Sequence, residues 1–224
     1  MEVQEVTRGS GILLAVSSLP SPYGIGTLGD AARQFVDLLV DLKQKYWQIL
    51  PVGPTSYGDS PYQTMSAFAG SPYLIDLDEL IEDGLLTKDE ISCYNWGQDE
   101  STIDYAILFD NRFRVLHQAF ERFDESDFGY QQFLNKNADW IEDYGLFMAL
   151  KETNGNERWQ NWPEEIKKKQ PVALAKCRKA LYNNIRFWAF CQYKFFEQWS
   201  RLREYANTKG VQLIGDVSFF IGLD

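Results

Sequence analysis

A strand–helix–strand pattern near the start of the chain limits the fold more than any other feature of the sequence. Residues 11–16 form a continuous apolar run, which is typical of a strand buried on both faces of a parallel sheet. After a loop rich in Ser, Pro and Gly, Asp30 is expected to cap a helix with one apolar face. Residues 46–50 form the next strand, which prolines end. Such a βαβ unit predicts parallel strands joined by a right-handed crossover.

The rest of the chain predicts a helical block and a final strand. Residues 73–77 read as a short strand or extended segment, and residues 133–150 as the clearest amphipathic helix. Pro171 opens a long helix that ends near Gly210, and a buried strand follows at residues 211–217. We therefore divide the chain into first βα units with a loop (1–78), a helical insertion subdomain (79–170), and a long helix with a third strand (171–224).

The number of βα units is too small for a closed parallel barrel. Without the helical block, the chain has room for about three such units, whereas a barrel of this type needs eight in ~250 residues. We therefore expect a fragment of a longer enzyme, with apolar strand edges exposed unless another segment pairs with them.

Composition indicates a neutral partner. The chain has 22 Lys and Arg against 32 Asp and Glu, a net charge of −10, and a pI near 4.7. Such acidity argues against nucleic acid and against an anionic membrane surface. The longest apolar run is far shorter than the ~20 residues of a membrane span, and the N-terminus lacks the apolar core of a signal peptide.

The cysteines and the single histidine narrow the chemistry further. Cys93, Cys177 and Cys191 are odd in number and form no CxxC pair, which favours reduced thiols in the cytoplasm. His117 is the only histidine, so a histidine-clustered metal site is excluded. It lies in a charged, helical-looking stretch and is expected to be structural. No metal or cofactor is expected.

The glycine motif at residues 24–29 matches GxGxxG, so a dinucleotide site must be weighed. Seven residues separate Val16 from Gly24, whereas a phosphate-binding turn follows its strand at once. The second strand also ends without an acidic residue for a ribose hydroxyl. We therefore expect these glycines to shape a loop.

Two strand ends carry candidate binding residues. The loop at residues 57–63 combines two tyrosines, an acid, a hydroxyl and an amide, which suits a sugar, although a turn with Tyr62 packed inward is equally open. Asp216 ends the strand at 211–217 and should reach the same edge, where it either binds substrate or caps the next turn. Asp76 is a similar candidate, but the strand pattern around it is less regular. Core positions are favoured over glycan platforms for Trp96, Trp159 and Trp162.

Several ordered motifs resemble one family. It is the 4-α-glucanotransferases of glycoside hydrolase family 77, also called amylomaltases or disproportionating enzymes. The likeness spans essentially the whole chain. Its motifs are residues 17–26 (SSLPSPYGIG), 46–54 (YWQILPVGP), 57–63 (YGDSPYQ), 66–77 (SAFAGSPYLIDL), 143–151 (DYGLFMALK), 195–199 (FFEQW) and 213–216 (LIGD).

This resemblance implies an α/β fold, the N-terminal part of a (β/α)8 TIM barrel with a helical insertion. It implies transfer of α-1,4-glucan segments between maltooligosaccharides, starch or glycogen chains, with retention through a covalent glycosyl-enzyme. Retention needs two carboxyl groups about 5–5.5 Å apart. The resemblance places these catalytic carboxylates beyond Asp224, in a C-terminal part of the same enzyme that would be this chain's partner.

The resemblance also assigns roles in substrate binding. Tyr62 matches a tyrosine of the donor-side sugar pocket, supported by Asp59 and Ser60, and Asp216 matches an acid that contacts the sugar near the cleavage point. Tyr57 and, on a shorter match, Tyr105 correspond to tyrosines of a secondary glucan site. Residues 217–220 depart from the family, which often has a proline after this strand.

Two alternatives to a transferase remain. The nearest enzymatic one is an amylase-like hydrolase of the same clan, which would produce new reducing ends. The other is a non-catalytic glucan-binding fragment, which the lack of the catalytic carboxylates favours for the chain by itself.

Overall fold

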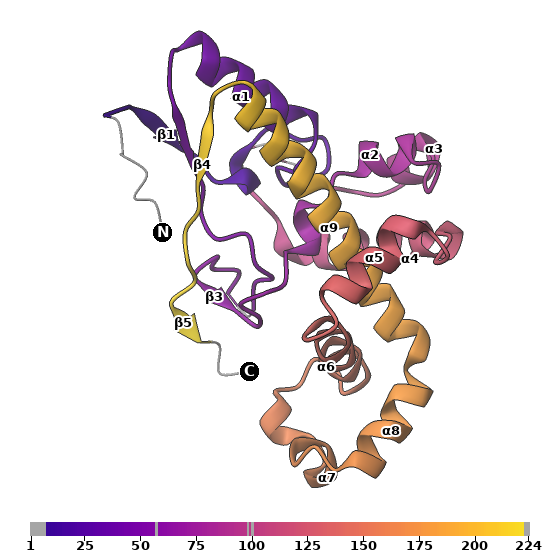
Figure 1. The fold of residues 1–224 in the computed structure, drawn as a ribbon. Coiled ribbons are helices and arrows are strands. Elements are labelled where there is room, and N and C mark those ends of the chain that lie inside the picture. Colours follow the sequence, from indigo (N-terminus) through magenta and orange to yellow (C-terminus); the bar gives the residue numbers. More distant parts are fainter. Residues whose placement is uncertain (1–7, 57, 98, 100, 222–224) are drawn as a thin grey trace.

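Three short parallel strands form the sheet that positions the candidate site. A computed structural model describes residues 8–56, 58–97, 99 and 101–221. In it, β1 (Gly11–Leu13), β2 (Tyr46–Gln48) and β4 (Gln212–Ile214) pair in the order β1-β2-β4 (Figure 1). Both pairings are parallel, as the βαβ pattern predicted. Their C-terminal ends therefore lie at one edge of the sheet.

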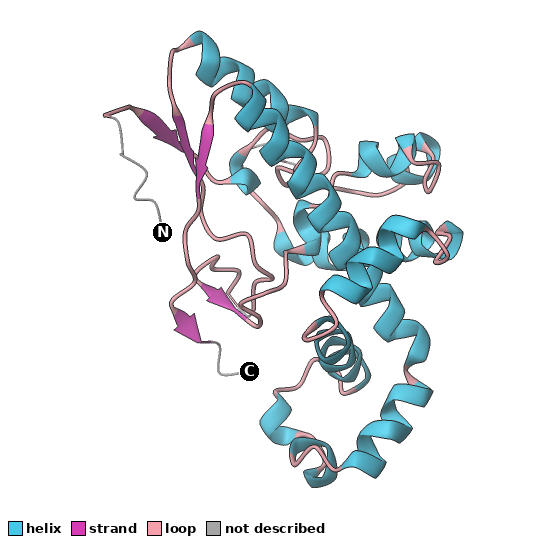
Figure 2. Ribbon diagram, viewed as in Figure 1, coloured by secondary structure: helices cyan, strands magenta, loops and turns pink. Residues whose placement is uncertain are grey.

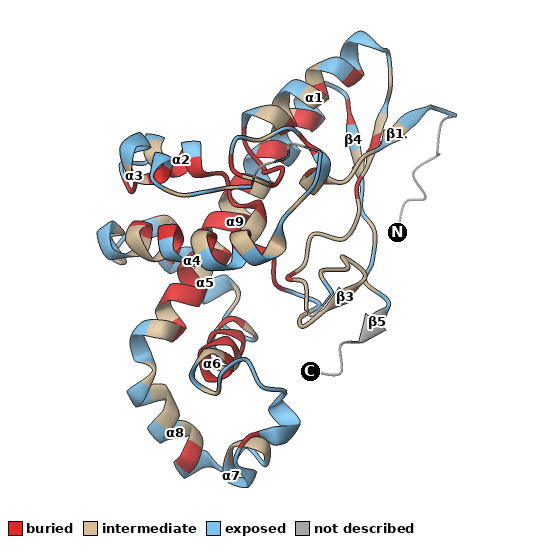
Figure 3. Ribbon diagram, turned by 180° about the vertical axis from the view of Figure 1, so that it is seen from behind, coloured by how far each residue is buried: buried red, intermediate tan, exposed pale blue. Residues whose placement is uncertain are grey.

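Helices cover only one face of this sheet in the described residues. The row Ile12, Trp47 and Leu213 packs into the core beneath α1 (Asp30–Asp41) and α9 (Tyr182–Thr208), and Trp47 is fully buried. Figure 3 shows the buried residues concentrated on the helical side of the strands.

The opposite row of the sheet is open to solvent. In that row Leu13 is 55% exposed and Ile214 is 43% exposed. The expectation that residues 11–16 and 211–217 are strands buried on both faces is therefore wrong for the described part of the chain. Their apolar side chains would fit a second layer of structure over this face, and the described residues provide no such layer.

The remaining elements are almost all helical, and Figure 2 shows them on the side of the molecule away from the sheet. The long α9 joins the sheet to a group of helices that we call the arm. The helices of the arm are α2 (Leu77–Glu82), α3 (Lys88–Ser92), α4 (Tyr105–Arg122), α5 (Phe128–Lys136), α6 (Ile141–Thr153), α7 (Glu164–Lys167) and α8 (Pro171–Ala180). Helix α9 packs against α1 and β4 and also against α4, α5, α6 and α8. Single 3-10 turns lie at Val16–Ser18, Pro72–Leu74 and Trp159–Asn161, and a two-stranded parallel pair joins β3 (Gln63–Thr64) to β5 (Phe220–Ile221).

Two predicted helices are each divided in the structure. The helix predicted at residues 133–150 is α5 followed by α6, because the Asn137 side chain donates to the carbonyl of Phe133 and ends α5. The long helix predicted from Pro171 is interrupted at Leu181, where α8 ends and α9 begins. Apolar periodicity continues across both breaks, so it does not reveal them.

Two local predictions at helix starts are also wrong. Gly29 is the cap of α1, and Asp30 is the first residue of the helix, where it pairs with Arg33. The strand alternative for residues 73–77 is wrong. A 3-10 turn is followed by Ile75 and Asp76 in extended backbone, and the Asp76 carboxylate accepts from the backbone N–H of Glu79 and caps α2.

Side chains of α9 hold the segment that follows the candidate site loop. The Gln192 amide accepts from the N–H of Gly70 at 2.8 Å and donates to its carbonyl at 2.9 Å. Gln198 repeats the arrangement on Asp76, at 2.7 and 3.1 Å. The Phe195 ring occupies the space that a side chain at residue 70 would need. This packing fixes the loop against the helix, since each amide supplies the two hydrogen bonds a neighbouring strand would give.

Most of the other predicted structural roles are confirmed, and the core position favoured for Trp159 is wrong. Gly24 has a positive φ of 76° and lies against the carbonyl of Trp96, so the glycine motif shapes a packed loop. Trp162 is buried and Trp96 packs against the core, as favoured, whereas Trp159 is 40% exposed. His117 is half-buried and stacks on Phe187.

The cysteines are in the reduced state that the sequence predicted. All three cysteines are free thiols, and burial raises the pKa of Cys191. No helix in the described ranges is long and apolar enough to cross a membrane.

Candidate functional site

The candidate site lies where the three parallel strands end. The turn Val16–Ser18 follows β1, the long loop to Tyr62 follows β2, and Asp216 follows β4. Because parallel strands place their C-terminal ends at one edge, segments far apart in sequence meet there.

Tyr62 and Asp216 form the central contact of this edge. The Tyr62 hydroxyl donates to Oδ2 of Asp216 at 2.9 Å, while Oδ1 of the same carboxylate accepts from the N–H of Val217 at 2.8 Å. The hydrogen bond to this carboxylate, together with partial burial, raises the pKa of Tyr62. The phenol therefore stays protonated and orients the carboxylate.

A backbone pairing supports this contact on both sides. β3 begins at the residue after Tyr62 and pairs with β5, and the Ser218 hydroxyl donates to the carbonyl of Pro61 at 2.9 Å. The rings of Tyr62 and Phe219 lie 5.1 Å apart. The loop after β2 and the segment after β4 thus form one unit, which sequence spacing alone did not predict.

Asp59 and Ser60 shape the loop that carries Tyr62. Asp59 has a positive φ of 53°, and its backbone N–H donates to the carbonyl of Ser56. Burial raises the pKa of the Asp59 carboxyl, although a 3.4 Å hydrogen bond from Thr55 acts against this. The Ser60 carbonyl accepts from Gln63. Tyr57, predicted in the same loop, lies outside the described residues.

Tyr105 and Asp59 lie together at another part of the loop that carries Tyr62. Both residues line a small cavity of about 50 Å³, together with Tyr73, whose ring meets that of Tyr105 edge-on at 6.0 Å. Burial and the Asp59 charge raise the pKa of Tyr105. The predicted site residues that the structure describes thus form two groups. Tyr62 lies with Asp216, Asp59 lies with Tyr105, and Ser60 lies in the loop between Asp59 and Tyr62.

A wider groove beside Asp216 was missed by sequence reasoning. It has a volume of about 280 Å³ and is lined in part by Thr64, Phe68, Trp199 and Ser218. Phe68 is 65% exposed and stacks on Trp140 with ring centroids 6.1 Å apart. A large aromatic residue in a loop of small residues was the available signal. Such a groove offers a flat apolar face next to a carboxylate.

Comparison with known proteins identifies the family. The model of a family described as 4-alpha-glucanotransferase matches residues 14–224. The chain belongs to this family. It is 44% identical over 210 residues to the 4-alpha-glucanotransferase of Clostridium butyricum, and 41% identical over 225 residues to that of Thermus thermophilus. These alignments cover 93% and 98% of the chain.

Solved amylomaltases share the fold. The amylomaltase of Streptococcus agalactiae, solved in complex with acarbose, matches 97% of this chain with a TM-score of 0.92 and 42% identity. The amylomaltase of Corynebacterium glutamicum matches 96% with a TM-score of 0.72 at 16% identity, which supports the fold alone.

The chain spans less than half of the proteins it matches. It covers 43% of the Clostridium relative, 44% of the Thermus relative and 45% of the Streptococcus structure. The glucanotransferase family and the mixed α/β architecture are therefore shown for this chain.

Proposed function

We propose that this chain forms the N-terminal, glucan-contacting part of a 4-alpha-glucanotransferase. The observation that carries the proposal is the hydrogen bond from the Tyr62 hydroxyl to Asp216, at the ends of parallel strands in a member of this family. A phenol ring beside an oriented carboxylate suits a sugar, because the ring offers an apolar face and the carboxylate accepts from hydroxyls.

The proposed roles follow the two groups of residues. Tyr62 lines the donor-side sugar pocket, and Asp216 contacts the sugar near the cleavage point. Asp59 and Ser60 shape the loop, and Tyr57 with Tyr105 belongs to a secondary glucan site. The nucleophile and the acid/base of a retaining double displacement are proposed to lie beyond Asp224, since retention requires two carboxyl groups about 5–5.5 Å apart.

The wider architecture is part of the same proposal. The parallel order β1-β2-β4 is what the first strands of a (β/α)8 TIM barrel would show, with residues 79–170 as a helical insertion between residues 1–78 and 171–224. The exposed apolar row of the sheet would then face the inside of that barrel.

The proposed substrates are maltooligosaccharides, starch and glycogen, without a cofactor. The acarbose complex of the Streptococcus amylomaltase supports an α-glucan ligand. The net charge of −10 does not favour binding to nucleic acid or to an anionic membrane. A cytoplasmic location is proposed from the three free thiols.

Incubation of the intact protein with maltotriose tests the proposal. We expect a ladder of shorter and longer oligomers with a nearly constant number of reducing ends. A steady rise in reducing ends would instead indicate a hydrolase. Residues 1–224 alone, shown to be folded by circular dichroism, should give no ladder, and a ladder from them would contradict the placement of the catalytic carboxylates.

A further inference from the structure

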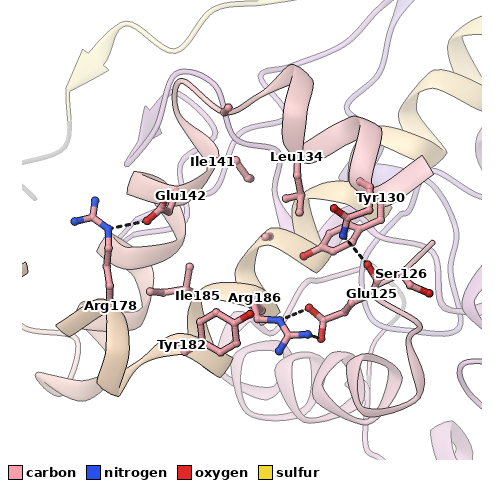
Figure 4. Close-up of a pocket in the computed structure, with 13 residues that line it drawn as sticks. Glu125, Ser126, Tyr130, Leu134, Ile141, Glu142, Arg178, Tyr182, Ile185 and Arg186 are labelled. Carbon is pink, nitrogen blue, oxygen red and sulfur yellow. Dashed lines mark hydrogen bonds and ion pairs between the residues drawn. The ribbon is translucent and has the colours of Figure 1, made fainter. Parts of the chain in front are cut away.

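A large cavity lies in the helical arm, away from the strand ends. Its volume is about 780 Å³, and it is enclosed by α5, α6, α8 and α9 (Figure 4). Leu134, Ile141 and Ile185 point into it and give it apolar walls. It shares no lining residue with the two cavities at the strand ends. A cavity of this size is typical of small-molecule sites, which span about 300–1,000 Å³.

A buried tyrosine in the wall presents an unused hydroxyl. Tyr130 is only 1% exposed, and its hydroxyl makes no hydrogen bond to any described residue. In Figure 4 this hydroxyl points into the cavity. Burial, and the nearby Tyr182 hydroxyl, raise the pKa of Tyr130 to about 12. A tyrosine hydroxyl can both donate and accept, so at the wall of a cavity it suits a ligand with hydroxyl groups.

The rim of the cavity is polar but electrically balanced. Arg186 pairs with Glu125, and Arg178 donates to Glu142 at 2.7 Å (Figure 4). Because each guanidinium already faces a carboxylate, the rim favours a neutral ligand that can both donate and accept.

An aromatic ring completes the mouth of the cavity. Tyr182 is 58% exposed, and the Arg186 guanidinium lies over the ring at 4.8 Å. An exposed aromatic face next to planar polar groups suits the C–H face and hydroxyl rim of a pyranose.

We propose that this cavity is a further non-catalytic site, separate from the strand-end site and from the secondary site proposed at Tyr57 and Tyr105, and that it binds a segment of a neutral α-1,4-glucan. The choice of ligand rests on the proposed function, whereas the site rests on the cavity, the Tyr130 hydroxyl and the Tyr182 ring. Glucan held here anchors a long chain to the arm while another part of it, or another chain, occupies the strand-end site.

Calorimetric titration of the intact protein with maltoheptaose tests the proposal. We expect at least two binding steps, one of them at the arm. Tyr182→Ala should weaken the step at the arm about tenfold, because it removes the aromatic platform, and Tyr130→Phe about threefold, because it removes one hydrogen bond. Ala138→Trp, at an exposed position in the lining, should block the same step by filling the cavity.

A matched control separates this site from other effects. Phe128→Ala removes a 74% exposed ring from the same arm, outside the cavity lining, and should change none of the steps. Tyr62→Ala should remove a different step, that of the strand-end site, so failure of the strand-end assignment is seen independently. The proposal is overturned if the wild type shows one step only, or if Tyr182→Ala and Ala138→Trp, with unchanged melting temperatures, retain every wild-type step unchanged.

Discussion

The hydroxyl of Tyr62 donates a 2.9 Å hydrogen bond to the carboxylate of Asp216, across 154 positions of sequence. This contact joins the loop after β2 to the end of β4, and Ser218 reinforces it through the carbonyl of Pro61. An oriented carboxylate at the ends of parallel strands is the part of the proposed glucan site that this chain itself supplies.

Tyr62→Phe tests this contact directly. The ring stays in place, but Asp216 loses its phenol donor, so we expect the affinity for maltooligosaccharides to fall about three- to tenfold, a typical value for one hydrogen bond. Calorimetry on the intact protein measures the change. Val172→Ala, at a 71% exposed position of α8 outside the described cavities, is the control. Equal affinities of wild type and Tyr62→Phe would contradict a binding role for the hydroxyl.

Gly70→Ala should destabilise the fold through a steric clash. The added methyl group would overlap the Phe195 ring, and overpacking of this kind costs about 1–3 kcal/mol. Thermal unfolding should show a lower melting temperature. Addition of Phe195→Leu makes room for the methyl group, so the double variant should lose less stability than the sum of the two single changes. Strict additivity would show that the two residues do not interact.

Gln192→Leu should separate the loop from α9. The substitution is similar in size, but it leaves the N–H and the carbonyl of Gly70 without partners, which costs roughly 2–4 kcal/mol. Hydrogen exchange at the amide of Gly70 should accelerate while that of Asp76, held by Gln198, stays protected. Unchanged protection at Gly70 would mean that the amide contact does not hold the loop.

Glu90 should give the fold a pH-dependent contribution at low pH. Arg122 donates to its carboxylate at 2.9 Å, and with Thr87 this lowers the pKa of Glu90 to about 2. A folded pKa below the unfolded value stabilises the fold above the unfolded pKa, near 4.5, and the contribution is lost as pH falls toward 2.

Comparison of melting temperatures tests this dependence. The advantage of wild type over Glu90→Gln should be largest near neutral pH, should shrink between about pH 4.5 and 2, and should decrease in high salt. Glu82→Gln changes another exposed carboxylate and serves as the control. A difference that stays constant across this pH range would show that Glu90 is not paired in solution.

Local patterns in the sequence were sufficient for much of the framework. The apolar runs before Val16 and Leu50 predicted two strands and their parallel pairing, because a short helical crossover permits little else. Placement of Asp216 at a strand end also predicted which edge it would reach. The helix breaks at residues 137–140 and at Leu181 were not predictable, since apolar periodicity runs through both.

The sequence by itself thus determined the family, the parallel strands and the edge that carries the candidate residues. Only the tertiary structure decided that Tyr62 meets Asp216, that Gln192 holds Gly70, and that Tyr130 turns its hydroxyl into a cavity of the arm. Strand and helix patterns come from neighbours a few positions apart, whereas these contacts join segments whose approach depends on the path of every loop between them.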